Sequence, residues 1–202
     1  MEEFEIRGSN WVLNKILNLE IALNRYNPLR GRSYTPLTQT LANKKAIINV
    51  KNRDNKCFLW SILAALHPAD KNPQRVSKYK QWEHEFDEAL SEIEFPVKLS
   101  NVSKFAKRTN MSINIYCYNN GCIAPLEVTD KEKEKHVDLL YLKDNAHIHY
   151  CLIQNLSRLV KSQVTKYKKK TFLCRMCLNH FRSEEKLKNH KSYCGVHKSA
   201  RI

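Results

Sequence analysis

Glycine and proline are scarce in this sequence, with four and six among 202 residues. We therefore expect no long disordered stretch, because such stretches are usually rich in both. No apolar run reaches the roughly 20 residues that a membrane span needs. The first residues, from Met1 to Glu5, lack the basic-then-apolar order of a signal peptide. We expect a protein that is neither secreted nor membrane-bound, and we interpret its seven cysteines as thiols or metal ligands rather than disulfides.

Acidic residues are also few, and the resulting net charge of +15 is unevenly placed. Residues 155–202 hold 13 Lys and Arg against two acids, a balance of +11. Residues 1–154 hold 22 against 18, a balance of +4. Clustered cations attract phosphate backbones because binding releases counterions. A solvated, solubilising tail is the alternative, but the distribution favours a nucleic-acid partner for the C-terminal quarter.

The sequence pattern of residues 1–163 predicts a first domain that begins with strands and helices. Within 11–26 the alternation of apolar residues favours a strand in the second half, and 46–50 is a short β-branched strand. The apolar run 57–66 predicts a buried helix that ends at His67-Pro68. Two further helices are predicted, at 74–90 and from Ser100, a candidate cap, to about Arg108.

Strands dominate the rest of this domain. Asn119-Asn120-Gly121 is typical of a hairpin turn. Helices followed by strands indicate an α+β fold with an antiparallel sheet. A basic linker, residues 164–170, leads to a separate C-terminal module at 171–197, which we expect to fold independently. The four predicted strands are 112–118, 122–128, 136–142 and 147–154.

The C-terminal module has the ligand spacing of a C2H2-type zinc finger with cysteine as its fourth ligand. The ligands are Cys174, Cys177, His190 and Cys194, in the pattern C-x2-C-x12-H-x3-C. Zn²⁺ prefers four tetrahedral nitrogen and sulfur ligands, and this spacing joins a turn to a helix around one ion. Three apolar residues stand where a ββα unit needs them: Phe172, Phe181 and Leu187. His197 is the competing fourth ligand, but its gap from His190 is wider than usual.

A finger of this kind can place its helix in the major groove of DNA. Ser183, Lys186 and Asn189 would then occupy the base-facing positions. The linker lysines Lys168, Lys169 and Lys170 would contact phosphates. One finger covers about 3 bp, so sequence specificity would be weak. Binding to RNA or to a protein, or a purely structural role, is the alternative use of a single finger.

A cysteine and a histidine in the first domain form a second candidate site. Cys57 stands at the start of the buried helix, where the helix dipole lowers a thiol pKa, and His149 stands in the last strand. A thiolate at a helix start that faces an imidazole on a sheet suits nucleophilic catalysis. In the alternative interpretation, Cys57 is a small buried hydrophobic residue and His149 is a histidine of the core.

The segment Asp54-x-x-Cys57-Phe58 leads into the buried helix, and the last strand contains His149-Tyr150. These two segments resemble the cysteine box and the histidine box of the ovarian-tumour-domain (OTU) deubiquitinases, which have a papain-like fold. The resemblance implies a cysteine peptidase with Cys57, His149 and Asp54 in the site and ubiquitin-like substrates. Cys151 stands where the family places the residue that orients the histidine, and Asp144 or Asn145 is a possible substitute. We therefore favour an inactive papain-like domain.

The last strand also permits a second metal site. His147, His149 and Cys151 alternate along the sequence and would share one face of a strand. Their side chains are all metal ligands in other proteins. This site is a third interpretation of the same segment.

Three signatures stand in order along the sequence and are followed directly by the finger: Arg25–Gly31 with Tyr34-x-Pro36-Leu37, the segment 46–68, and His149–Ile153 with 155–159. Together they resemble the region that precedes the exonuclease and polymerase domains of family B DNA polymerases from Maverick/Polinton mobile elements. The resemblance implies a nuclear, DNA-associated setting. We expect a nuclear or cytosolic protein whose partners include nucleic acid and replication proteins. The resemblance implies no polymerase activity, because the sequence lacks an Asp-Thr-Asp palm motif and is too short for that core. We expect a fragment or a domesticated remnant.

Overall fold

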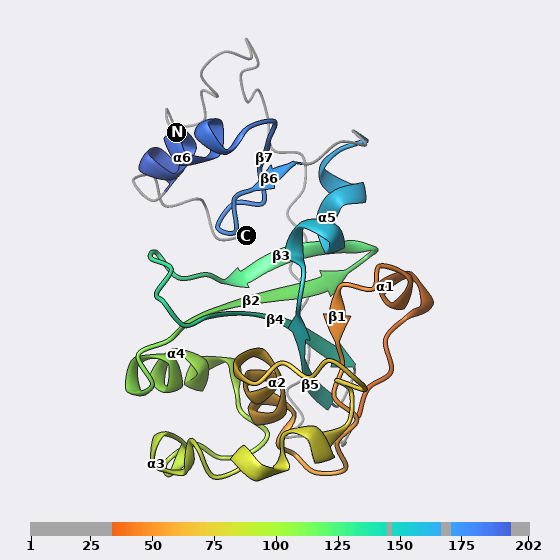
Figure 1. Ribbon diagram of the computed structural model, residues 1–202, viewed down its shortest axis with the longest axis vertical. Helices are drawn as coiled ribbons and strands as arrows, with labels where there is room; N and C mark the ends of the chain where they lie inside the picture. Colours follow the sequence, from red (N-terminus) through yellow and green to blue (C-terminus); the bar gives the residue numbers. More distant parts are fainter. Residues whose placement is uncertain (1–33, 145–146, 167–170, 195–202) are drawn as a thin grey trace, which may run out of the picture.

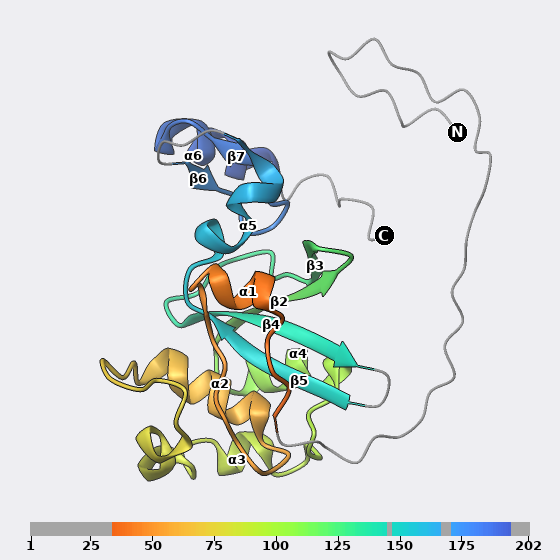
Figure 2. The ribbon, with the colours of Figure 1, turned by 90° about the vertical axis from the view of Figure 1, so that its right-hand side faces the viewer.

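The computed structural model describes residues 34–144, 147–166 and 171–194. It has six α-helices, two short 3-10 turns and seven strands in that part of the chain (Figures 1 and 2). Four features of the sequence analysis lie outside the described residues: the predicted strand within 11–26, the signature Arg25–Gly31, the lysines Lys168–Lys170 and the competing ligand His197. In chain order the elements are α1 (Gln39–Asn43), β1 (Ile47–Ile48), α2 (Cys57–Leu66), the 3-10 turns Val76–Lys78 and Lys80–Trp82, α3 (Asp87–Leu90), α4 (Leu99–Arg108), β2 (Ser112–Asn119), β3 (Cys122–Glu127), β4 (His136–Asp144), β5 (His147–Ile153), α5 (Leu156–Val164), β6 (Phe172–Leu173), β7 (His180–Phe181) and α6 (Glu184–Cys194).

The fold is α+β, built on one five-stranded sheet. Its strand order is β1-β5-β4-β2-β3, and a second, two-stranded sheet joins β6 to β7. The hairpin turn predicted between β2 and β3 is confirmed. Asn119 pairs with Cys122, and Asn120 and Gly121 both have positive φ, 48° and 84°, as a tight hairpin turn requires.

The sheet is mixed, so the expectation of an antiparallel sheet was wrong. Strands β2 and β4 run parallel, with Ser112 opposite His136. The hairpin partner β3 occupies one edge of β2, and residues 128–135 carry the chain around to the other edge. Polar side chains of β2 hold this connection: Ser112 Oγ accepts from the Lys133 N–H at 2.9 Å, and Asn114 Oδ1 accepts from the Thr129 N–H at 2.9 Å.

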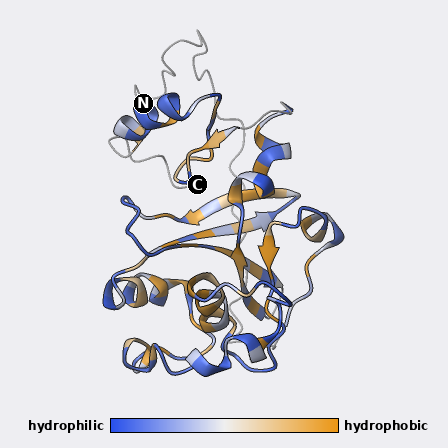
Figure 3. Cartoon of the chain, viewed as in Figure 1, coloured by the Kyte–Doolittle hydropathy of each residue, from blue (hydrophilic) through white to orange (hydrophobic). Residues whose placement is uncertain are grey.

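Helix α2 is the centre of the main core. It is hydrophobic all round, as Figure 3 shows, and eight of its ten residues are buried. It packs on β5, where Phe58 makes an edge contact with the ring of Tyr150. Helices α2, α3 and α4 lie on one side of the sheet, and α5 lies on the other with the C-terminal strands and α6 (Figures 1 and 2).

Several helix predictions need correction. Residues 74–90 form two 3-10 turns and the four-residue α3 instead of one helix. Their side chains bond locally: Tyr79 is fully buried and donates its hydroxyl to the Pro73 carbonyl, and Trp82 stacks on His67 at 4.0 Å. Helix α4 begins after Lys98 without a side-chain cap, so Ser100 lies inside the helix. No helix in the described residues is long and apolar enough to cross a membrane.

Candidate metal centre and the Cys57 region

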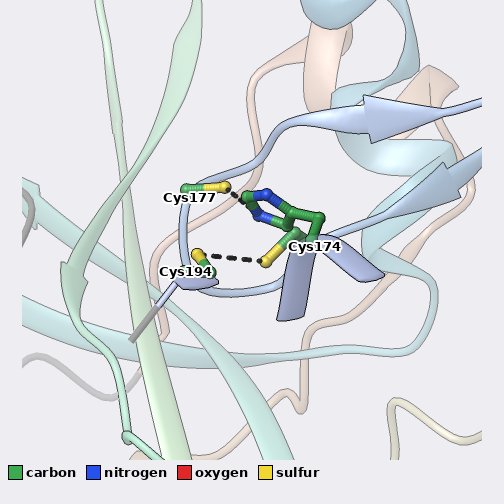
Figure 4. A group of neighbouring side chains, drawn as sticks. Cys174, Cys177 and Cys194 are labelled. Atoms are coloured by element: carbon green, nitrogen blue, oxygen red, sulfur yellow. Dashed lines mark hydrogen bonds between the residues drawn. The ribbon is translucent and has the colours of Figure 1, made fainter. Parts of the chain in front are cut away.

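The predicted ligands Cys174, Cys177, His190 and Cys194 come together in the structure. Their ligand atoms all lie within 4.8 Å of one another (Figure 4). Cys174 follows β6, Cys177 lies in the turn before β7, and His190 and Cys194 lie one helical turn apart on α6. The spacing i, i+4 places these last two side chains on one face of the helix. The cluster can therefore hold one metal ion.

The distances within the cluster suit tetrahedral coordination. Cys174 Sγ lies 3.7 Å from Cys194 Sγ, and Cys177 Sγ lies 3.2 Å from His190 Nε2. Metal–sulfur bonds of about 2.3 Å at tetrahedral angles separate two sulfurs by about 3.8 Å, and sulfur and nitrogen by about 3.5 Å. The side chains are thus close to the positions that an ion would require.

The crowded thiols favour a cation among them. A hydrogen bond from Cys177 lowers the pKa of Cys174 to about 4. The hydrogen bond that Cys177 donates raises its own pKa, and burial raises the pKa of Cys194. Three thiolates packed this closely would repel one another. A divalent cation would stabilise all three as thiolates.

The local fold of residues 171–194, the C-terminal module, explains how the ligands are held. The backbone N–H of Leu178 donates to the Cys174 carbonyl at 2.9 Å, and Leu178 takes a positive φ of 60° that closes the turn. Phe172 pairs with Phe181 across the two strands. The Phe181 ring lies 4.7 Å from the imidazole of His190. Phe181, one of the apolar residues identified in the sequence, thus packs beside the ligand His190.

The C-terminal module is docked on the sheet, although the sequence led us to expect an independent unit behind a linker. The Tyr116 hydroxyl donates to the Arg175 carbonyl at 2.8 Å. Arg175 Nε donates to Asp138 Oδ2 at 3.1 Å, and its Nη1 lies 3.3 Å from Glu132. Leu178 is buried in the same apolar cluster as residues of α5 and the sheet. The ligand-bearing turn is therefore also the docking element.

Replacing Arg175 by alanine is expected to loosen this docking while the metal cluster stays intact. Asp138, which is 7% exposed, would lose its guanidinium partner. The expected loss of unfolding free energy is about 1–3 kcal/mol, below the value for a fully buried pair because Arg175 is 42% exposed. Denaturant unfolding and hydrogen exchange of β6 and α6 measure the effect.

Lys191 gives a matched control for this prediction. Its ammonium lies 3.7 Å from Glu132 in an exposed pair of the same interface. Lys191→Ala is expected to cost less than about 1 kcal/mol. Equal stability and equal exchange in Arg175→Ala and the wild type would show that Arg175 does not dock the C-terminal module.

Two of the three predicted base-facing residues, Lys186 and Asn189, lie on α6, which is mostly hydrophilic (Figure 3), and Ser183 directly precedes this helix. Lys186 and Asn189 are exposed, and Tyr193, 71% exposed, follows on the same side of the helix. Ser183 is only partly exposed, and its hydroxyl accepts from the Lys186 N–H at 3.3 Å, as a helix cap does. Tyr193 was missed in the sequence analysis, and its spacing from Lys186 and Asn189 was the available signal.

Cys57 does begin helix α2, but it is not placed as a reactive thiolate. Its side chain is 3% exposed, and Sγ lies 4.0 Å from the Ile148 carbonyl oxygen. Burial raises the pKa of Cys57 to about 11. In the described residues no hydrogen bond joins this sulfur to His149, whose Nδ1 has no partner. Alternation along β5 puts His149 on the face opposite Tyr150, which packs on α2.

His149 is oriented by Asn49, a residue that the sequence analysis missed. Its Nε2 donates to Asn49 Oδ1 at 2.8 Å, and the Asn49 amide donates to the Thr35 carbonyl at 2.9 Å. Cys151 does not orient the imidazole, since it is fully buried in the apolar cluster under α5. Burial lowers the pKa of His149 to about 4, so the imidazole is neutral at pH 7. A polar residue within the β-branched run 46–50 was the signal for Asn49.

Asp54 has a structural role in the loop before α2. Its carboxylate accepts from the Lys56 backbone N–H at 2.9 Å, from Trp60 Nε1 at 3.0 Å and from Asn52 Nδ2 at 2.9 Å. These bonds hold the loop and fix the first turn of the helix. The carboxylate therefore holds the backbone near Cys57 in place, and these hydrogen bonds go to loop and helix groups.

The proposed second metal site on β5 is not formed. Among the residues that the structure describes, the C-terminal cluster is the one group of His, Cys, Asp and Glu side chains arranged to hold a metal ion. Within the trio His147, His149 and Cys151, the imidazole of His149 is bonded to Asn49, and Cys151 is enclosed by apolar side chains. This interpretation of the segment was wrong.

The comparisons with known proteins add no relative from which a role can be transferred. The fold and the residues described above are therefore the basis for any functional assignment. The chain matches no protein-family model, no curated protein and no solved structure.

Proposed function

We propose that the chain is a zinc-binding protein whose C-terminal module is a ββα zinc finger that contacts nucleic acid. The observation that carries the proposal is the cluster of three cysteines and one histidine, held within 4.8 Å by two strands and a helix. Thiolate-rich tetrahedral sites select zinc or iron–sulfur clusters, and a Cys3His set from one short module favours a single Zn²⁺. The ion would complete the module by joining α6 to the ligand-bearing turn.

Nucleic acid is the partner that the exposed surface of this module favours. Docking uses Arg175 and Lys191, which face Glu132. Lys186 and Asn189 stay exposed on another side of α6. The excess charge of residues 155–202 is +11, and such a surface attracts phosphates. The resemblance to mobile-element polymerases supports DNA and a nuclear setting for this partner.

Salt-dependent binding of a fluorescent 20-bp duplex tests this proposal. If about five phosphates are neutralised, log K falls against log salt with a slope of about −4 to −5. Lys186→Gln with Asn189→Ala is expected to weaken binding several-fold and to reduce the slope by about 1. Lys188→Gln is the matched control, because Lys188 is exposed on the same helix but two residues away, on a different face. Equal losses in both variants, or affinity that ignores salt, would refute contact through this face.

A papain-like cysteine peptidase is the second candidate, and one observation favours it. Asn49 Oδ1 is an acceptor, so the His149 proton lies on Nε2 and the lone pair of Nδ1 is left without a partner. A neutral imidazole with a free lone pair is the form that a general base requires. The burial of Cys57 and its raised pKa argue against this activity in the conformation described.

A further inference from the structure

We infer that α5 and the C-terminal end of α1 form a second surface that binds the phosphate backbone of the same nucleic acid. We call it the α1–α5 face and define it by Lys44, Lys45 and Arg158. The inference rests on the proposed function of the C-terminal module and extends it to a larger site. The face is separate from the metal cluster and from helix α6.

Contacts between α5 and the two residues that follow α1 bring these cations together. Lys44 Nζ donates to Ser162 Oγ, and Arg158 Nη1 donates to the Lys45 carbonyl at 3.3 Å. Arg158 and Ser162 are four residues apart on α5 and therefore lie on one side of that helix. Lys45 and Arg158 are exposed, and Lys44 is partly exposed. The face is thus a fixed arrangement rather than a set of scattered surface residues.

Carboxylates are absent from the two segments that build this face. Neither 34–53 nor 147–183 contains an Asp or Glu. Within the described part of the chain, no salt bridge involves Lys44, Lys45 or Arg158, whereas Arg175 and Lys191 of the C-terminal module are both paired. Clustered like charges repel one another, so cations carried by two segments without acids are suited to a polyanion that neutralises them.

Helix α5 lies beside the C-terminal module, so we take the polyanion on the α1–α5 face to be the same nucleic acid that the module binds. Both views in Figures 1 and 2 place α5 between α1 and the C-terminal strands. Leu156 and Leu159 of α5 belong to the same apolar cluster as Leu178 of the C-terminal module. A single finger reads about 3 bp, and a second set of phosphate contacts beside it would lengthen the site and raise affinity without base specificity.

Fluorescence anisotropy with the 20-bp duplex tests the inference on the full chain. Lys45→Gln with Arg158→Gln is expected to weaken binding about tenfold near 0.1 M salt and to reduce the salt slope by about 1.8, for two lost phosphate contacts. Lys78→Gln with Lys80→Gln is the matched control. Both lysines are exposed, in the 3-10 turns before α3 at the end of the molecule away from the C-terminal module, and should change affinity less than twofold. Arg158→Lys keeps the charge and should keep most of the affinity, which separates lost charge from lost folding.

The outcomes distinguish this inference from the proposed function. If the α1–α5 variant binds as tightly as the control while the Lys186/Asn189 variant is weakened, the inference is wrong and the function of the C-terminal module stands. If only the α1–α5 variant is weakened, the face binds the duplex and the role of α6 is refuted. Absence of wild-type binding at 50 mM salt overturns both. Equal affinity for a 20-residue polyglutamate peptide would make an acidic protein the partner and contradict the inference.

Discussion

Replacing Cys177 by serine is expected to abolish metal binding and to unfold the C-terminal module. Within this module only Cys174 and Leu178 are buried, so the strands and the helix have almost no core of their own. In units of this kind the metal supplies the folding free energy, about 10–16 kcal/mol for zinc at pH 7. Loss of one ligand therefore removes most of what holds β6, β7 and α6 together. Hydrogen exchange of residues 171–194 and the bound-metal content measure the result.

The docked arrangement adds a second consequence to this substitution. Leu178 packs in the apolar cluster formed by the sheet and α5. Unfolding of the C-terminal module would expose that cluster and lower the stability of the sheet domain by about 1.5–3 kcal/mol for this one side chain. Cys122→Ser is the control, because Cys122 is exposed and lies outside the cluster. A Cys177→Ser protein that keeps one metal ion and protected amides in α6 would contradict this description.

Cys57 is expected to react with iodoacetamide about two orders of magnitude more slowly than an ordinary thiol at pH 7.5. The thiolate is the reactive form, and a pKa of about 11 against a usual value near 8.5 reduces its fraction by that factor. Burial slows access further, since the side chain is 3% exposed. The rate should rise with pH towards about 11, because the thiol ionises as pH approaches its pKa. Denaturation should remove the protection.

Peptide mass spectrometry can follow this labelling against an internal reference. Cys122 is exposed in the same chain and should be modified first. His149→Ala is expected to leave the rate at Cys57 unchanged, because no hydrogen bond joins the two side chains in the described structure. Labelling of Cys57 that is faster than that of Cys122 and depends on His149 would instead establish a reactive pair and favour the peptidase.

Local sequence signals predicted the parts of the structure that depend on neighbouring residues. The ligand spacing from Cys174 to Cys194 identified a cluster that the structure forms, because a turn and a helix set the positions of four nearby side chains. The buried helix was predicted from its apolar run, and the hairpin at Asn120-Gly121 was predicted from its turn residues. The mixed class, α+β, followed from the order of these elements.

Contacts between distant segments were the part that sequence patterns did not supply. Asn49 meets His149 across 100 residues, and Arg175 meets Asp138 across 37. Neither pair lies within one helix or hairpin, so no periodicity connects its members. The parallel pairing of β2 with β4 depends on which edge of β2 the chain reaches after β3, and side chains of Ser112 and Asn114 fix that route. Helix α5 was missed because its apolar stripe is narrow, with three buried residues.

X-ray absorption of the purified full chain tests the proposed zinc site most directly. The account predicts one zinc per chain with three sulfur ligands at about 2.3 Å and one nitrogen ligand at about 2.0–2.1 Å. These ligands are Cys174, Cys177, Cys194 and His190, whose side chains are already gathered in the structure. A protein that contains no zinc, or whose zinc has any shell other than three sulfurs and one nitrogen, would contradict it.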